Sequence, residues 1–521
     1  MFYTEKRDGF SRLGLLEIGG SRITTPAMLE GEILEKIDVG KAAYAVKKLF
    51  PEIYENLKPK GDIEILTGIS TMSPQEITEA FSELRSIKPL YAVACADPKN
   101  VSLLIYLGAD IVDNIMAVAK GYSGIYFLGD LELRLEKLKS FPCGCEFCRK
   151  QDLSGLESNE VLEITAKHNT EQLRLEVEKC RFLLEEEALR NYVEAKAKLH
   201  PELTALLRFS DREESPCFPR FRRGTCYFCS QESINRFEVR YFLNRIVECY
   251  EPKTKALLLL PCTARKPYLT SKTHRIIRSA VKVNVNEIVI SSPLVVPREF
   301  ELMYPAVNYD TPVTGHWSEE EVEFVAGWLA KLVEKGNFEK VVAHVEGGYR
   351  KIVEVALKDF DVIFTAEKEI LSEESLKRLR KELEGYERYD LFTEMFSHAL
   401  RYQFDVKAEG AVRGKYPDIE LFNGERLARF DLRYGNVDIY SEIAMKLLER
   451  RDYSIEIAEF EPTTTIFCAG IEDADPKIRP NDVVVFSNST YYGVGIARMH
   501  GSEMLEAKKG IAVEVRRKYR F

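Results

Sequence analysis

Short apolar runs alternate with longer amphipathic segments over much of the chain. Between about residues 60 and 130, IEIL, LYAVAC and ADIVDNI are typical of buried strands, and PQEITEAFSEL is typical of a helix. A second alternation has the apolar runs KALLLLPC, NEIVISSP and FEKVVAHV, separated by RKPYLTSKTHRIIRSAVK and SEEEVEFVAGWLAKLVEK, which predict helices. Because strands that alternate with helices form parallel sheets, we expect two α/β units.

The remaining segments predict smaller units. Residues 157–207 have apolar positions at helical spacing, and DREESPCFPRFRRG marks a linker. Residues 385–450 indicate a small α+β module, and the last 70 residues, with turns at RPND and NSTYYG, predict a small β-barrel. A chain of 521 residues exceeds one ordinary core. We therefore expect a multidomain α/β protein with domains at 1–210, 235–382, 385–450 and 451–521.

Composition narrows the class of protein. A hydrophobic fraction of 45% and a charged fraction of 30% are typical of soluble globular chains. The apolar run 256–261 is far too short to span a membrane, and the charged N-terminus has no secretory pattern, so we predict a cytoplasmic protein without a membrane partner. The net charge of −9 argues against nucleic acid, but residues 508–521 hold six Lys or Arg and one Glu. A second basic cluster, Arg220, Arg222 and Arg223, is typical of a solvated face.

Eleven cysteines occur in the chain, and two groups are crowded. Cys143, Cys145 and Cys148 are followed by His168, and three thiolates with one imidazole make a closed tetrahedral set suited to structural zinc. The alternative is three buried thiols and an unrelated histidine. The second group, Cys217, Cys226 and Cys229, is either another metal knuckle completed by Cys249 or Cys180, or a chance cluster.

Polar side chains follow the apolar run ALLLL. Ligands of open α/β sheets gather at the carboxyl ends of strands, so this position favours a reaction site. A cation such as Lys266 or protonated His274 would activate a Cys262 thiolate. The alternative is that Cys262 is an ordinary core residue. The candidate residues are Cys262, Lys266, Tyr268, Ser271 and His274.

The N-terminal part resembles tRNA-guanine transglycosylases. RDGFSRLGLLEIGGSRITTPAMLE resembles their start, and ADIVDNIMAVAKG, FPCGCEFC and KHN resemble their zinc-bearing half. The resemblance implies an abbreviated (β/α) barrel-like domain in which Asp113 is the nucleophile for ribose C1′. The stretch between these segments is too short for a full barrel with its second aspartate and base pocket. We therefore expect no base exchange, and Asp113 is alternatively a relic or a capping residue.

The motif PCxxxKPYxxSxxH at 261–274 resembles that of archaeosine synthases, as do SSPLVVPREFE, YPAVNYDTPVTG and WSEEE downstream. The resemblance implies an amidinotransferase-type enzyme that adds free lysine to the nitrile of 7-cyano-7-deazaguanine (preQ0) at position 15 in the tRNA D-arm. A radical S-adenosylmethionine enzyme is the implied partner that completes archaeosine.

Two chemical routes are open for this addition. Cys262 forms a thioimide that lysine displaces, or lysine attacks directly with His274 as base, which we prefer from sequence. Tyr268 and Ser271 are candidate donors to the nitrile nitrogen, and Lys266 either shares that role or holds a phosphate or carboxylate. Asp310 and Glu346 are candidate partners of the lysine ammonium. The candidate substrate-binding residues are Ser291, Ser292, Asp310 and Glu346.

The C-terminal segment, IRPND through VEVRRKYRF, resembles a PUA domain, and residues 385–450 resemble the small domain before it in archaeal transglycosylases. This implies tRNA as the partner, with basic side chains on phosphates. The alternatives are an active transglycosylase and a non-catalytic tRNA-binding subunit, and a homodimer is left open. The candidate RNA-binding residues are Arg479, Lys508, Lys509, Arg516 and Arg517.

Overall fold

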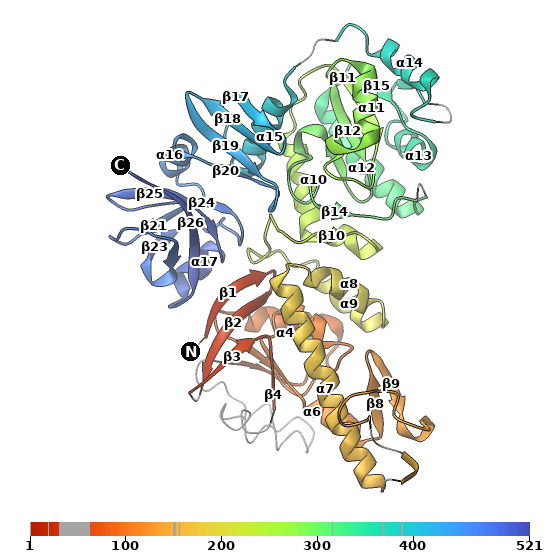
Figure 1. Ribbon diagram of the computed structural model, residues 1–521, viewed down its shortest axis with the longest axis vertical. Coiled ribbons are helices and arrows are strands. Elements are labelled where there is room, and N and C mark those ends of the chain that lie inside the picture. Colours follow the sequence, from red (N-terminus) through yellow and green to blue (C-terminus); the bar gives the residue numbers. More distant parts are fainter. Residues whose placement is uncertain are drawn as a thin grey trace.

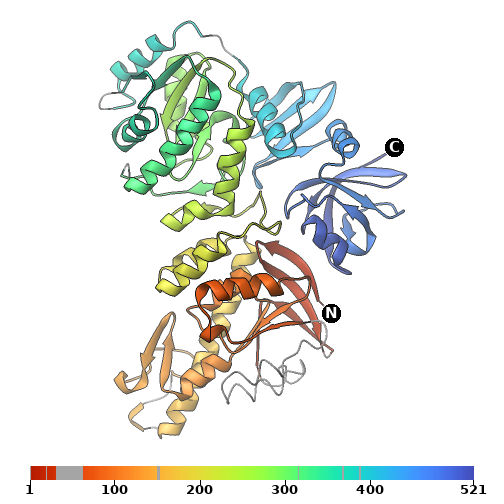
Figure 2. The same cartoon turned by 180° about the vertical axis from the view of Figure 1, so that it is seen from behind.

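The computed structural model describes residues 2–18, 20–30, 63–149, 153–155, 157–314, 316–366, 369–386 and 389–521. The chain folds into several packed units (Figures 1 and 2), with the N-terminal part at one end, the second α/β unit at the other and the C-terminal barrel beside their junction. Residues 31–62 of the expected N-terminal domain lie outside the described residues.

The N-terminal unit contains two main sheets. An antiparallel sheet has the order β1 (Phe2–Asp8), β2 (Ser11–Ile18), β3 (Ser21–Thr25). A parallel sheet has the order β4 (Ala27–Leu29), β7 (Ile111–Asp113), β6 (Leu90–Ala92), β5 (Glu64–Leu66). These four described parallel strands form an open sheet, so Asp113 ends a strand within it.

Helices complete this unit. PQEITEAFSEL forms α4 (Pro74–Leu84), as predicted, since Ser73 and Glu76 make a capping box at its start. The other elements are α5 (Val101–Leu107), α6 (Ile115–Tyr122), the β8 (Ile125–Leu128)–β9 (Leu131–Arg134) hairpin, the long α7 (Ser158–Glu185), α8 (Leu189–Ala197) and α9 (Pro201–Ser210). The hairpin and one end of α7 lie farthest from the second α/β unit (Figure 1).

The second α/β unit has a five-stranded sheet with the order β13-β12-β11-β15-β16. Strands β12 (Asn286–Ile290), β11 (Ala256–Pro261), β15 (Lys340–Ala343) and β16 (Val362–Phe364) are parallel, and β13 (Val295–Pro297) is antiparallel. The helices are α10 (Phe237–Cys249), α11 (Lys272–Val281), α12 (Glu319–Gly336), α13 (Gly347–Ala356) and α14 (Glu373–Glu382). A short pair, β10 (Cys226–Tyr227) and β14 (Tyr309–Asp310), lies beside them.

One predicted helix begins later than expected. The segment from Arg265 was predicted to be helical, but α11 begins only at Lys272. Ser271 is its N-cap and accepts a hydrogen bond from the backbone N–H of His274 at 3.2 Å. Pro267 favours an extended residue before it, so the preceding residues remain a loop at the strand end.

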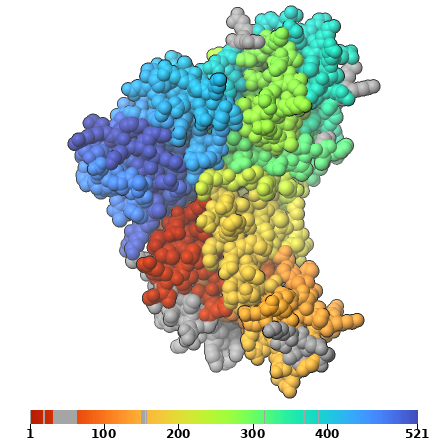
Figure 3. All heavy atoms as spheres, in the orientation of Figure 1, coloured from red at the N-terminus to blue at the C-terminus, as the bar shows by residue number. Residues whose placement is uncertain are grey.

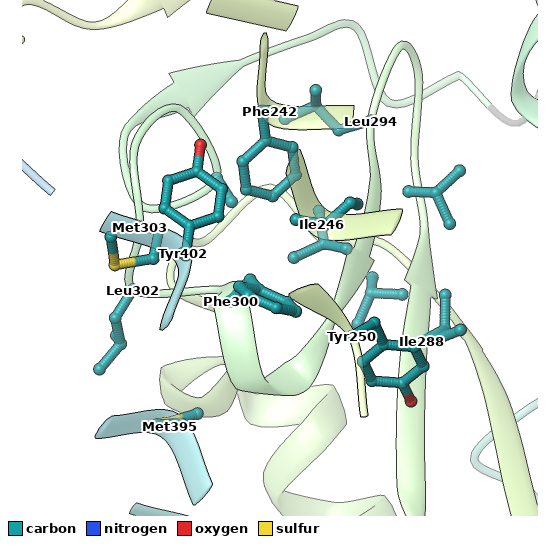
Figure 4. Close-up of a cluster of buried hydrophobic side chains, with 14 of the residues drawn as sticks. Phe242, Ile246, Tyr250, Ile288, Leu294, Phe300, Leu302, Met303, Met395 and Tyr402 are labelled. Atoms are coloured by element: carbon teal, nitrogen blue, oxygen red, sulfur yellow. The ribbon is translucent and has the colours of Figure 1, made fainter. Parts of the chain in front are cut away.

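The core of the second α/β unit continues into the next unit. Phe242 and Ile246 of α10, with Tyr250 just after it, lie beside Phe300 and Tyr402 (Figure 4). Tyr402 belongs to α15 (Leu391–Phe404) of the following module. That module adds the antiparallel sheet β17 (Ala411–Lys415), β18 (Asp418–Asn423), β19 (Glu425–Asp431), β20 (Asn436–Ile439) and helix α16 (Ser441–Arg450).

The C-terminal unit is a six-stranded sheet with the order β22-β26-β25-β24-β21-β23 and its own core. Its elements are β21 (Ser454–Ile457), β22 (Thr465–Phe467), β23 (Ile471–Ala474), β24 (Val483–Ser487), β25 (Tyr491–Ala497), α17 (Gly501–Glu506) and β26 (Ile511–Arg520). In the described part of the chain, no helix combines the length and apolarity needed to cross a bilayer.

The basic cluster in the linker corrects the sequence interpretation. Arg220 pairs with Asp482 of the C-terminal unit at 2.6 Å, and Arg222 pairs with Asp8 of β1 and with Glu238 of α10. Arg222 is buried, so its charge requires these partners. These two arginines therefore join units of the protein instead of facing solvent. The N-terminal (red), middle (yellow) and C-terminal (blue) regions are seen in contact in Figure 3.

Candidate active site at the ends of the second sheet

Three neighbouring strands of the second sheet end in polar residues. Cys262 follows β11, Ser291 follows β12 and Glu346 lies three residues after β15. The strands are adjacent and parallel, so these positions share the carboxyl edge of the sheet. This edge is where ligands of open α/β sheets bind.

Hydroxyl groups surround Cys262. The Oη atom of Tyr349, on the first turn of α13, lies 3.0 Å from Cys262 Sγ. Tyr268 donates a hydrogen bond to Tyr309, whose hydroxyl donates to Ser291 Oγ at 2.8 Å. Burial raises the pKa of all three tyrosines, so they remain proton donors at neutral pH.

Lys266 enters the same group with an unsatisfied ammonium. Its Nζ lies 4.4 Å from the centroid of the Tyr309 ring and 3.8 Å from Asp310 Oδ1, which is beyond hydrogen-bonding distance. The side chain is 5% exposed, and Nζ has no hydrogen-bond partner among the described residues. Burial lowers the pKa of Lys266, while Cys262 and Asp310 act in the opposite direction.

Glu346 is an acidic residue that, like the basic Lys266, has a buried atom without a hydrogen bond. It is the N-cap residue of α13, and its Oε2 atom is buried without a hydrogen-bond partner in the described part of the chain. The predicted binding residues thus differ: Ser291 and Ser292 are buried, with Ser292 Oγ donating to Glu321 Oε1 at 3.0 Å, whereas Asp310 is exposed.

A cavity of about 400 Å³ adjoins this group. Its lining includes Ser292, Thr311 and Trp317, and the Trp317 ring meets the Tyr349 ring edge-on with centroids 4.6 Å apart. The volume is sufficient for a nucleobase or an amino acid. Trp317, Tyr309 and Tyr349 were not singled out from the sequence. Tyr349 is detectable there, because EGGY follows a predicted buried strand just as PCTARK does.

His274 stacks on Tyr268, with ring centroids 5.5 Å apart, but both His274 and Ser271 are engaged in hydrogen bonds of the scaffold. His274 is fully buried, its Nε2–H donates to the Pro261 carbonyl at 2.9 Å, and its Nδ1 accepts from Arg298 at 2.7 Å. Burial, with Arg298 beside it, lowers the pKa of His274 to about 3. Both ring nitrogens are therefore engaged in the scaffold, which corrects the predicted general-base role. Ser271 likewise serves as a helix cap.

Asp113, at the end of β7, is also fully satisfied. Its Oδ2 accepts from Tyr91 Oη at 2.6 Å and from the Ala94 N–H at 2.9 Å, and its Oδ1 accepts from the Ile115 N–H at 3.0 Å. Burial raises its pKa, and these hydrogen bonds oppose the shift. The side chain is 0% exposed and its hydrogen bonds hold the loop after β7, which favours a structural role over the nucleophile role. Asn114, and not Asp113, is the N-cap residue of α6.

Three of the four predicted metal ligands come together. One ligand atom each from Cys143, Cys145 and His168 lies within 4.8 Å of the others, and Cys145 Sγ is 3.4 Å from His168 Nδ1. The His168 Nε2–H donates to the Phe127 carbonyl at 2.7 Å, which leaves Nδ1 free to bind a metal. Cys148 lies outside this set, with its Sγ 3.4 Å from Tyr126 Oη.

The other cysteine cluster does not assemble. Cys226 Sγ lies 2.8 Å from Tyr304 Oη, Cys229 is exposed at the cavity, and Cys249 contacts the Arg401 carbonyl. Cys217 is buried elsewhere; burial raises the pKa of its thiol, but Arg7 and His500 outweigh that effect and lower it to about 6. Among the described residues these cysteines form no metal-binding group.

The candidate RNA-binding side chains divide into free and engaged ones. Lys508 and Lys509 are exposed, and Arg516 is half-buried. Arg517 pairs with Asp438 of the preceding module, and Arg479 donates to the carbonyls of Ser215 and Phe218 in the linker. The last two arginines therefore bind neighbouring units, and only the others are available to a phosphate.

Family models match most of the chain. Residues 66–202 match queuine tRNA-ribosyltransferase, 239–383 a domain of unknown function, 389–448 a pre-PUA domain and 456–519 the PUA domain. A transglycosylase-like unit and an RNA-binding PUA unit on one chain, together with the polar strand ends of the second α/β unit, define a tRNA-modifying transferase.

Relatives identify the family. The chain is 37% identical to archaeosine synthase subunit alpha of Methanosarcina acetivorans, over 88% of this chain and 80% of that protein. It is 34% identical to archaeosine synthase of Haloferax volcanii, over 87% and 81%. The tRNA-guanine(15) transglycosylase of Methanothermobacter thermautotrophicus is 24% identical over 85% and 68%. The chain belongs to the archaeosine synthase family.

Proposed function

We propose that this chain forms archaeosine in tRNA by adding the amine of free lysine to the nitrile of 7-cyano-7-deazaguanine at position 15. The observation that carries the proposal is the convergence of Cys262, Lys266 and Tyr349 at the carboxyl edge of the second sheet, beside a cavity of about 400 Å³. Family membership supports the same product, because the relatives are named for it.

Cys262 is the proposed nucleophile. Its sulfur adds to the nitrile carbon as the carbon–nitrogen π bond breaks, and the thiol proton passes through the Tyr349 hydroxyl to the nitrile nitrogen. The lysine amine then attacks the thioimide carbon, the carbon–sulfur bond breaks, and the departing thiolate takes up the amine proton. The net reaction adds N–H across the nitrile and gives a substituted amidine.

The position of His274 favours this route over direct attack. Direct attack requires a base for the amine, and the predicted base has both nitrogens engaged in hydrogen bonds. With a thioimide intermediate, one proton moves when the thiol adds and another when the amine displaces the thiolate. Cys262 and Tyr349 can carry out both transfers. The sequence-based preference is therefore reversed.

The other units are proposed to hold the RNA and to maintain the scaffold. The C-terminal unit, through Lys508 and Lys509, places the tRNA backbone, and a radical S-adenosylmethionine enzyme cleaves the lysine skeleton of the product. Cys143, Cys145 and His168 are proposed to hold a structural zinc, with Cys148 nearby as a fourth thiolate. The 3.4 Å between Cys145 Sγ and His168 Nδ1 suits two ligands of one tetrahedral ion.

The test is mass spectrometry of tRNA carrying the cyano base after incubation with isotope-labelled lysine. The proposal expects a lysine adduct on the base with the wild-type chain. Cys262→Ser should bind tRNA normally and lose turnover by at least about 10³-fold. Normal turnover by this variant contradicts the covalent route, and no adduct from the wild type contradicts the function.

A further inference from the structure

Lys266 and Glu346 carry opposite charges, and each has a buried polar atom to which the described part of the protein gives no hydrogen bond. In the described part of the chain, the Lys266 ammonium has no hydrogen-bond acceptor and the buried Glu346 Oε2 has no donor. A buried charged group without hydrogen bonds costs stability, and proteins avoid this arrangement unless a ligand completes it. Both atoms therefore indicate a missing ligand.

The two residues follow neighbouring parallel strands of one sheet. Lys266 follows β11 and Glu346 follows β15, and these strands pair in parallel with Leu259 opposite Ala343. One turn after Glu346, Tyr349 reaches Cys262 Sγ at 3.0 Å. The contact between Cys262 and Tyr349 thus connects the segment that bears Lys266 to the helix whose N-cap residue is Glu346.

We propose that Lys266 and Glu346 bind the head group of a free α-amino acid, with its carboxylate on Lys266 and its α-ammonium on Glu346. This rests on the proposed function, in which the amino acid supplies the amine. A zwitterion provides the acceptor and the donor that the two residues lack. A tRNA phosphate would provide only acceptors, and at 5% exposure Lys266 is out of reach of an RNA backbone.

The head-group clamp, meaning Lys266 and Glu346 together, determines which amine reacts. When the α-ammonium is held by Glu346, it is charged and cannot attack, so the distal amine is presented to the nitrile carbon. Cadaverine lacks the carboxylate and 6-aminohexanoate lacks the α-ammonium. Each analogue therefore loses the contact with one of the two residues.

The test measures the thermal midpoint of the full chain with increasing L-lysine, cadaverine or 6-aminohexanoate, with and without cyano-base tRNA, since binding to the folded state raises the midpoint. Lys266→Met and Glu346→Gln should each weaken lysine binding at least about tenfold. Lys266→Met should leave cadaverine binding unchanged, and Glu346→Gln should leave 6-aminohexanoate binding unchanged. Lys351→Met and Glu354→Gln, exposed positions on α13, make the same charge changes and should bind lysine normally.

The ligand-free midpoint separates binding from a structural role. Removal of a buried ammonium that lacks a hydrogen bond relieves a desolvation cost, so Lys266→Met should be no less stable than the wild type. Normal lysine binding by both variants overturns the clamp. The clamp is also overturned if up to about 10 mM lysine leaves the thermal midpoint of the wild type unchanged, both with and without cyano-base tRNA. If lysine binding depends on Lys266 and Glu346 but the tRNA is not modified, the proposed function is contradicted and the clamp is not. If both variants add lysine to tRNA as fast as the wild type, the clamp is contradicted and the proposed function is not.

Discussion

The parallel strands of the N-terminal sheet and those of the second α/β unit both end in polar residues, and the two ends differ in how these residues are hydrogen-bonded. At β7, the Asp113 carboxylate accepts three hydrogen bonds from Tyr91, Ala94 and Ile115 and is sealed from solvent. After β11 and β15, the ammonium of Lys266 and one oxygen of Glu346 have no hydrogen-bond partner among the described residues, and Trp317 of the nearby cavity contacts Tyr349 of the same group.

This difference distinguishes a structural strand end from a reactive one. A carboxylate that accepts three hydrogen bonds and is sealed from solvent stabilises the loop around it and is not open to a substrate. A buried group without a partner is destabilising until a ligand binds, and such sites are retained where binding or catalysis requires them. His274 belongs with Asp113 in this respect, although it lies within the motif of the second sheet.

The largest expected effect comes from comparing one substitution at each of the two strand ends. Cys262→Ala should lower lysine addition by at least about 10³-fold, because it removes the proposed nucleophile. Asp113→Asn should change the rate by less than about threefold per folded molecule, because Asp113 contacts only the scaffold. Initial rates on cyano-base tRNA provide the measurement, and a comparable loss in both variants would place chemistry at both ends.

His274→Ala should destabilise the protein by roughly 2–4 kcal/mol in urea unfolding, since it leaves the Pro261 carbonyl and an Arg298 donor without partners and opens a cavity. The folded-state pKa of His274, about 3, lies below its unfolded value near 6.5. The unfolded chain therefore takes up a proton first, and the wild type loses stability as the pH falls from 6.5 toward 3, by up to about 1.4 kcal/mol per pH unit. The variant should lack this component; an unchanged slope would contradict the assignment.

Tyr349→Phe tests whether the hydroxyl beside Cys262 takes part in the proton transfers. Loss of the hydroxyl beside Cys262 Sγ should lower turnover about 10- to 100-fold with the fold intact. Tyr402→Phe is the matched control, because the Tyr402 hydroxyl is buried without a hydrogen-bond partner among the described residues. Equal rates for Tyr349→Phe and the wild type would remove Tyr349 from the proton path.

The smallest expected effect is on RNA affinity. Lys508→Ala with Lys509→Ala should weaken tRNA binding several-fold. The number of counterions released on binding, measured from the salt dependence of the affinity, should fall by up to about two, because each lysine neutralises a phosphate. Lys377→Ala with Lys381→Ala on α14 makes the same charge change at exposed positions in another unit. Filter binding at several salt concentrations compares them; equal weakening by both pairs would indicate a general charge effect.

The sequence predicted the strand runs well because their apolar pattern is local. ALLLL, NEIVI and KVVA form β11, β12 and β15, and the capping box places α4 on the predicted segment. It failed for His274 because helix α11 turns that side chain inward, and only the Arg298 side chain, 24 residues later, shows that the ring is part of the scaffold. It omitted Tyr309 and Tyr349 because both approach Cys262 from other elements, β14 and α13.

The most direct measurement is peptide mapping by mass spectrometry after incubation with cyano-base tRNA in the absence of lysine, followed by nuclease digestion. We predict an added mass of the cyano base and its attached nucleotide on the peptide containing Cys262, and none on the peptide containing Asp113. A ribose-linked adduct on Asp113, or an unmodified Cys262 in an enzyme that modifies tRNA once lysine is supplied, would contradict the account.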